Sequence, residues 1–275
     1  IYIVPGPISA ATTLAGAFTI PGSTAEQKLG GSPVAVGDIG GSGSADLLIG
    51  APLPAPSGLV RQGAAYAFFG PIAGSKTLAG ADVTWVGPGP YVGLGTNVAI
   101  GNVTGTAANE ALISGLQLLR SGTQVGGVTV WSGVTAGTYD MSAAATPSTT
   151  ILGIDANDDC GTSLALGRLN ADSYDDIVFA CSTADGPTNA TSGAGEIHVV
   201  KGAATLPVTW NLATRPSALV IYGAAAGVQL GRYGVGLSLG DLNSDSKADI
   251  RAGSYVGGGT SHSKPGAVDC IASPL

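Results

Sequence analysis

A unit made of a strand, a polar loop and a second strand recurs four times along this chain of 275 residues. The loops start at residues 38, 102, 168 and 241, so successive copies lie 64, 66 and 73 residues apart. In the first copy the apolar run 34–36 leads into the loop, and the run 47–49 leads out of it. A repeat of this length indicates small sheets that cannot bury a core alone and therefore stack on their neighbours.

Further strands follow each copy in phase with the first two. Third strands are predicted at 63–70, 127–131, 195–200 and 266–271, and residues 17–20, 83–86 and 218–222 suit a fourth, outer strand. Residues 1–7 match 65–71, so we expect the chain to begin with the third strand of a unit whose first two strands are absent.

The predicted fold is therefore all-β. We expect a β-propeller of four-stranded antiparallel blades, with four nearly complete blades and a partial N-terminal one. The expected repeat units of this single domain or propeller fragment are 1–32 (partial), 33–95, 96–160, 161–232 and 233–275.

Composition and charge exclude several classes of protein. Hydrophobic residues make up 44% of the chain and charged residues 11%, which is unlike a disordered segment. The net charge is −7, and the 11 Lys and Arg are not clustered, so we expect no nucleic-acid partner. No uninterrupted apolar run is long enough to predict a membrane span. The chain opens at Ile1 in strand-like sequence, so we expect any targeting segment to have been removed or to lie outside these residues.

The fourth loop has the spacing of a calcium-binding loop. Asp241, Asn243, Asp245 and Asp249 place side-chain oxygens at loop positions 1, 3, 5 and 9. Calcium takes about 6–8 oxygen ligands, so these four, the carbonyl of Lys247 and water could complete its shell. The alternative is that Asp, Asn and Ser simply favour tight turns. Position 6, which is usually Gly in such loops, is Ser246 here.

The other three loops match this pattern less well. The third loop has Asn170, Asp172 and Asp176 at positions 3, 5 and 9, but Arg168 at position 1 would compete with a metal ion. The first loop offers Asp38 and Asp46. The second loop has one carboxylate, and we interpret it as a plain turn; its polar side chains are Asn102, Thr104, Thr106 and Glu110.

Together these motifs resemble the FG-GAP repeats of integrin α-subunit propellers and their microbial relatives. The resemblance rests on residues 240–249, on 46–52 (Asp-Leu-Leu-Ile-Gly-Ala-Pro) and on 63–70 (Gly-Ala-Ala-Tyr-Ala-Phe-Phe-Gly), and it covers nearly the whole chain. It implies structural Ca²⁺ in loops on one face and a partner on the opposite face. In this chain the opposite face would carry the connections 53–62, 117–126, 182–194 and 255–265.

The resemblance predicts a non-catalytic, calcium-stabilised extracellular or cell-surface propeller for adhesion or protein assembly. The family usually closes seven blades, so we expect the missing blades to come from a second chain or from polypeptide outside these residues. Two alternatives are an accessory propeller module of a secreted enzyme and a structural subunit of an extracellular filament.

Cysteines, glycosylation motifs and histidines complete the sequence-level candidates. Cys160 and Cys181 flank the third loop and its strands, so a hairpin would bring them to one end; a disulfide is predicted there, with buried free thiols as the alternative. Cys270 is left over. Asn102 and Asn189 start Asn-X-Thr acceptor motifs for glycosylation. His198 and His262 lie in no recognisable catalytic or zinc-ligand spacing, and we expect them to be packed or solvated.

Overall fold

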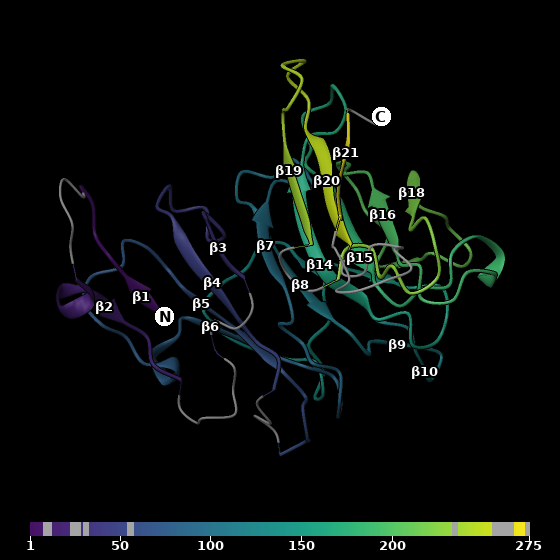
Figure 1. Ribbon diagram of the computed structural model, residues 1–275. Helices are drawn as coiled ribbons and strands as arrows, with labels where there is room; N and C mark the ends of the chain where they lie inside the picture. Colours follow the sequence, from purple (N-terminus) through teal and green to yellow (C-terminus); the bar gives the residue numbers. More distant parts are fainter. Residues whose placement is uncertain are drawn as a thin grey trace.

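The computed structural model describes residues 1–7, 13–22, 29, 33–53, 58–232, 236–254 and 267–272. The regular structure in these residues consists of short strands and three 3₁₀ turns (Figure 1). The predicted connection 255–265 and His262 lie outside the described residues.

Four sheets follow one another along the chain, each built from consecutive antiparallel strands. In the first sheet these are β3 (Val34–Gly37), β4 (Asp46–Ala51), β5 (Ala64–Phe68) and β6 (Val83–Val86). In the second they are β7 (Val98–Gly101), β8 (Glu110–Gly115), β11 (Gly127–Trp131) and β13 (Thr149–Leu152). In the third they are β14 (Cys160–Gly167), β15 (Asp176–Cys181), β16 (Glu196–Val200) and β18 (Leu219–Tyr222), and in the fourth β19 (Leu237–Gly240), β20 (Asp249–Ser254) and β21 (Ala267–Ile271).

Smaller elements join or precede these sheets. An N-terminal hairpin pairs β1 (Tyr2–Ile3) with β2 (Phe18–Thr19), and β9 (Leu119–Arg120) pairs with β10 (Thr123–Gln124). The 3₁₀ turns are η1 (Leu14–Gly16), η2 (Leu78–Gly80) and η3 (Pro187–Asn189). The all-β prediction is confirmed, and the first three sheets each contain four antiparallel strands in the expected order. The described strands form several open antiparallel sheets and no closed barrel.

Two sheets contain a fifth strand that the sequence analysis missed. The strand β12 (Gly137–Asp140) leaves the second unit and pairs in parallel with β6 of the first sheet. In the same way β17 (Thr209–Asn211) leaves the third unit and pairs in parallel with β13 of the second sheet. The N-terminal hairpin shows a one-bond version of this contact, because the Lys76 N–H donates to the Thr19 carbonyl at 2.9 Å. The two donated strands tie the second unit to the first and the third unit to the second.

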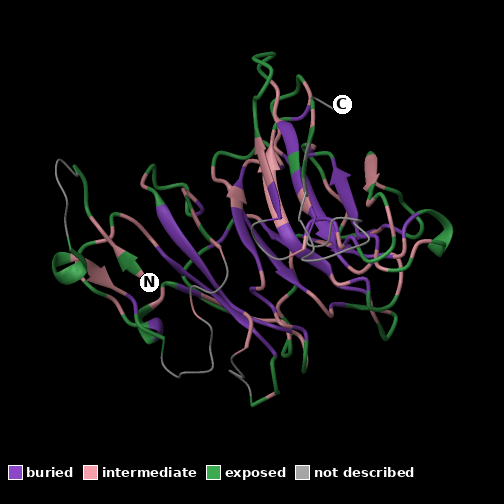
Figure 2. Ribbon diagram, viewed as in Figure 1, coloured by how far each residue is buried: buried purple, intermediate pink, exposed green. Residues whose placement is uncertain are grey.

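The hydrophobic core is divided into clusters that lie between successive structural units. Leu48 and Trp85 of the first sheet pack with Ile113 and Trp131 of the second, while the adjacent Leu112 belongs to a cluster shared with the third sheet. Alternate residues of one strand thus face two different neighbours, which explains the continuous apolar runs. Figure 2 shows the buried strands running through the middle of successive sheets. Each sheet is stabilised by contact with its neighbours.

Glycines allow the start of the third strand to approach the link that leads from the fourth strand to the next sheet. At the start of β5, Gly63 has a φ of 79°, and a Cβ built on it would lie 2.2 Å from the Leu94 nitrogen. At the equivalent place before β16, Gly195 has a φ of 81°, and its Cβ would lie 2.4 Å from the Leu230 nitrogen. Any larger residue would be strained at both positions and would clash with the backbone of this link.

Candidate functional site

The four loops between the first and second strands form a continuous row. The N–H of Asn109 donates to the Asp38 carbonyl at 2.9 Å, which links the second loop to the first. The N–H of Asp175 donates to the Asn102 carbonyl and that of Ala248 to the Arg168 carbonyl, both at 2.7 Å. The same contact thus joins each loop to the next, and the candidate metal ligands lie along one end of the sheets.

A buried carboxylate at loop position 9 clamps each loop. Asp46 is 1% exposed and accepts backbone N–H groups from Ile39 at 2.8 Å, Gly40 at 3.1 Å and Gly70 at 2.8 Å. It therefore joins its own loop to the end of the third strand. Asp176 accepts from Leu169 and Gly202 in the same way.

Glu110 and Asp249 occupy the same position in the second and fourth loops. Glu110 accepts the Val103 N–H at 2.8 Å, and Asp249 accepts the Leu242 N–H at 2.7 Å. Glu110 also accepts hydrogen bonds from the hydroxyl groups of Thr104 and Thr106. The sequence analysis missed the clamp because it considered these carboxylates mainly as metal ligands.

The fourth loop brings its polar side chains together. The Asn243 amide nitrogen lies 3.1 Å from one oxygen of Asp245 and 3.5 Å from one oxygen of Asp249, so these three side chains converge. Asp241 accepts the N–H of Ser244 at 2.6 Å and that of Ser246 at 2.9 Å. The remaining predicted ligand, Asp241, is therefore held by backbone N–H groups of its own loop.

The first and fourth loops share one backbone conformation. Positions 4 and 6 have positive φ in both loops; they are Gly41 and Gly43 in the first, with φ of 69° and 80°. In the fourth they are Ser244 and Ser246, with φ of 65° and 67°. Asp38 accepts the N–H of Gly43 at 2.7 Å, just as Asp241 accepts that of Ser246. The fourth loop therefore carries strain that the first loop avoids with glycine.

The four side chains of the fourth loop are of the kind that calcium prefers, but their three carboxylates do not converge on one point. Hard oxygen donors of Asp and Asn are the ligands that calcium prefers. Within the described residues, no group of three or more His, Cys, Asp or Glu side chains could hold a metal ion. A calcium ion in this loop would therefore depend on Asn243, the Lys247 carbonyl and water as well as on Asp241, Asp245 and Asp249.

In the third loop, Asp172 accepts the Tyr174 N–H at 2.9 Å, and the Asn170 amide donates to Asp176 at 3.2 Å. Burial raises the pKa of Asp176, while the backbone N–H groups of Leu169 and Gly202 oppose that shift. The three predicted ligands of this loop are thus bonded to one another or to the backbone.

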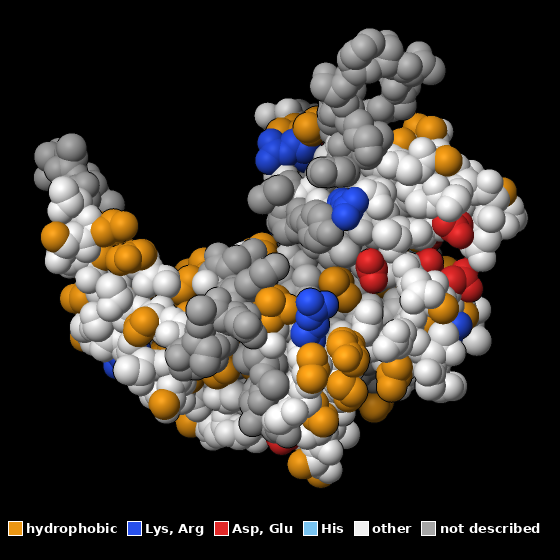
Figure 3. Space-filling view, turned by 60° about the horizontal axis from the view of Figure 1, so that its bottom comes forward, with side chains coloured by type: hydrophobic (Ala, Val, Ile, Leu, Met, Phe, Trp, Pro, Cys, Tyr) orange, Lys and Arg blue, Asp and Glu red, His pale blue; other side chains and the backbone are white. Residues whose placement is uncertain are grey.

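The opposite end of the sheets carries a pocket of about 730 Å³. Its walls come from the segments 88–92 and 117–124, from Thr150 and Leu152 of β13, and from Met141, Ala156 and Asn157. Tyr91 and Leu119 contribute to it and are each 52% exposed, and Val60, also from this end, is 58% exposed. Figure 3, in which this end comes forward, shows hydrophobic side chains gathered on the surface and, apart from them, a group of acidic ones.

A smaller pocket of about 340 Å³ is acidic, and its lining includes Asp155, Asp158, Glu196 and part of the connection 182–194. Burial raises the pKa of Asp158 to about 6, with smaller contributions from the charges of Asp155, Glu196 and Asp185; the Asp155 N–H, which donates to Asp158 at 3.2 Å, acts in the opposite direction. Sequence reasoning missed this pocket because its carboxylates are separated along the chain.

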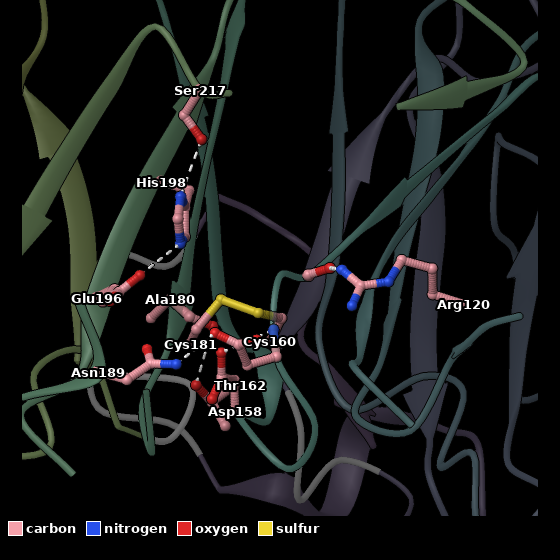
Figure 4. A network of polar contacts seen from close by, with 12 residues as sticks. Arg120, Asp158, Cys160, Thr162, Ala180, Cys181, Asn189, Glu196, His198 and Ser217 are labelled. Carbon is pink, nitrogen blue, oxygen red and sulfur yellow. Dashed lines mark hydrogen bonds and ion pairs between the residues drawn. A yellow bond between two sulfur atoms is a disulfide. The ribbon is translucent and has the colours of Figure 1, made fainter. Parts of the chain in front are cut away.

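Beside the acidic pocket lies a buried histidine network (Figure 4). The Nε2 atom of His198 lies 3.1 Å from a Glu196 oxygen, and its Nδ1 atom lies 2.9 Å from the Ser217 hydroxyl. The ring is stacked on Phe179 with centroids 5.6 Å apart. His198 is 1% exposed, so it is a packed side chain with both nitrogens paired.

Cys160 and Cys181 form a disulfide, the pair that the sequence predicts. The two residues are direct partners in the β14–β15 register, and both are buried. Cys270 is free and exposed.

Of the predicted glycosylation sites, Asn189 is exposed in η3 and its amide donates to Asp155 at 3.0 Å, whereas Asn102 is half-buried and accepts the Gly105 N–H. No helix of the described chain has the length and apolar character needed to cross a bilayer.

No model of a known protein family matches the chain, and no curated protein is significantly similar to it. Its sheets, loops and pockets must therefore carry the functional argument.

Proposed function

We propose that the chain is part of a calcium-stabilised, non-catalytic extracellular β-propeller that mediates adhesion or protein assembly. The observation that carries this proposal is the repeated packing of four sheets, each sharing a hydrophobic cluster with the next. Small sheets that depend on their neighbours are the architecture of propellers and related repeat arrays. The disulfide supports an oxidising, extracellular location.

Calcium has a structural role in this proposal. It would bind the fourth loop through Asp241, Asn243, Asp245, Asp249 and the Lys247 carbonyl. Neutralising three carboxylates at the end of a two-stranded hairpin would relieve their mutual repulsion and fix the loop.

The calcium site is tested by thermal unfolding with added Ca²⁺ and with EDTA. We expect Ca²⁺ to raise the unfolding temperature, and Asp245→Asn to reduce that rise because it removes one charge and keeps an oxygen acceptor for the Lys247 N–H. Asp82→Asn is the control, since Asp82 is exposed and lies in the link before β6. An unfolding temperature that is the same in Ca²⁺ and in EDTA would refute the calcium site.

Partner binding is assigned to the end that carries the 730 Å³ pocket. An apolar pocket lined by exposed Tyr91 and Leu119, with exposed Val60 next to Tyr91, is the kind of surface that protein partners bury. Separately from this surface, we propose a protein chain that supplies the missing blades. A native mass equal to one 26.7 kDa chain, in a stable and folded sample, would contradict assembly with a second copy.

A further inference from the structure

The outer edge of the fourth strand is covered in the first two sheets. In the second sheet the Thr150 N–H donates to the Val208 carbonyl at 2.8 Å, and the Leu152 carbonyl accepts the Leu212 N–H at 3.1 Å. In the first sheet the Val86 carbonyl accepts the Met141 N–H, also at 3.1 Å. Both covers are parallel strands from the following unit.

The two covering strands share a sequence pattern and one packing mode. They read Thr-Tyr-Asp at 138–140 and Thr-Trp-Asn at 209–211, with the aromatic residue in the middle. Tyr139 pairs with Trp85, its ring stacked at a centroid distance of 5.9 Å. Trp210 pairs with Ile151 and is 9% exposed. The aromatic side chain of each strand therefore closes the hydrophobic cluster between two units.

The third sheet lacks such a cover within the described residues, where β18 pairs with β16 alone. The strands β6 and β13 each have three buried residues and one half-buried residue, whereas β18 has no buried residue and its Tyr222 is 44% exposed. The register places Ile221 at the position of Trp85 and Ile151. Val220 and Tyr222 correspondingly stand at the positions of Thr150 and Leu152.

We propose that the outer edge of β18 is the docking site for a parallel strand with the pattern Thr, aromatic, Asp or Asn. The occupant is the connecting strand that follows the third strand of the next unit in the order of the repeat, as β12 follows β11 and β17 follows β16. It would accept the Val220 N–H, donate to the Tyr222 carbonyl and cover Ile221 with its aromatic ring. Addition of a strand to a free edge is a general mode of peptide recognition. This inference goes beyond the proposed function, because it requires neither calcium nor a closed ring.

A peptide with the sequence of residues 205–216 tests the proposal directly. The peptide contains Trp210 and Arg215, and in the chain the Arg215 guanidinium carbon lies 3.9 Å from the Trp210 ring centre. The peptide therefore includes the aromatic residue that would cover Ile221 and the Arg side chain that packs on it. The labelled peptide is titrated into the whole chain by fluorescence anisotropy, and backbone amide exchange locates the binding. We expect saturable binding and about 10-fold slower exchange at the Val220 amide.

Two altered peptides provide the matched controls. Replacing the Trp210 residue of the peptide by Ala, or methylating the backbone nitrogen of its Leu212 residue, should each weaken binding about 10-fold. Absence of saturable binding up to about 1 mM peptide would overturn the proposal. It would also be overturned by equal binding of all three peptides, or by slowed exchange at Thr150 of β13 in place of Val220.

Discussion

Replacing Asp46 by Asn should destabilise the chain strongly, although the two side chains have the same shape. Asp46 is 1% exposed and accepts three backbone N–H groups, two on one oxygen and one, from Gly70, on the other. The oxygen of an Asn side chain can still accept the N–H groups of Ile39 and Gly40, but the Asn NH₂ group, itself a donor, then faces the Gly70 N–H. The loss of one charge-assisted bond and the unsatisfied buried donor together cost about 3 kcal/mol.

The matched control is Asp82→Asn. Asp82 is exposed and accepts the neighbouring Phe69 N–H at 2.8 Å, so water can replace the lost bond, and we expect a change of about 0.5 kcal/mol or less. Urea unfolding measured by tryptophan fluorescence gives both free energies. For a chain of this size, the Asp46 variant should also melt about 6–12 °C lower. Equal effects of the two substitutions would refute the clamp.

Three further outcomes follow from the geometry. Ser246→Gly should raise the free energy of unfolding by about 0.5–1 kcal/mol because φ is positive at this position. Ser173→Gly, at the same position of the third loop but without positive φ, should lower it. Urea unfolding in EDTA distinguishes the two variants, and a lower free energy of unfolding for Ser246→Gly would contradict the strain argument. Burial raises the pKa of Asp158 from 3.8 to about 6, so between these pH values the folded chain retains a proton that the unfolded chain has lost. The stabilisation from this proton is complete below pH of about 4 and is lost as the pH rises through about 6. The free energy of unfolding should fall by about 1–2 kcal/mol over this range, allowing for partial solvent screening. Subtracting the profile of Asp158→Asn isolates this effect, and identical profiles would exclude it. Replacing Cys160 and Cys181 together by Ser should lower the free energy of unfolding by about 3 kcal/mol, since the bridge closes a loop with a sequence separation of 21; no difference from the oxidised wild type in urea would contradict this.

Much of the fold could be predicted from the sequence because the repeat carries the information. Residues 47–49 are apolar without interruption, and the structure explains why: Leu48 faces the second sheet, while Leu47 and Ile49 face the N-terminal hairpin. The pairing of Cys160 with Cys181 was equally accessible, since both residues flank one predicted hairpin. These features depend on contacts that are local or repeated.

The donated strands could not be predicted by the same reasoning. Residues 137–140 and 209–211 are short and polar, and their strand conformation depends on an edge supplied by the preceding unit. The role of Asp46 was also hidden, because its third bond, to Gly70, joins residues 24 positions apart. A carboxylate that binds backbone N–H groups and one that binds a cation look the same in a sequence.

The central claim is that each sheet is stable only through its neighbours, and amide hydrogen exchange of Val178→Ala tests it most directly. Val178 lies in β15 and is fully buried in the cluster shared with Ile250 and Ala252 of β20. Its truncation should cost about 2 kcal/mol. We predict that the amides of β15 and β20 lose protection together. Loss of protection in β15 with β20 unchanged would contradict the mutual support of the sheets.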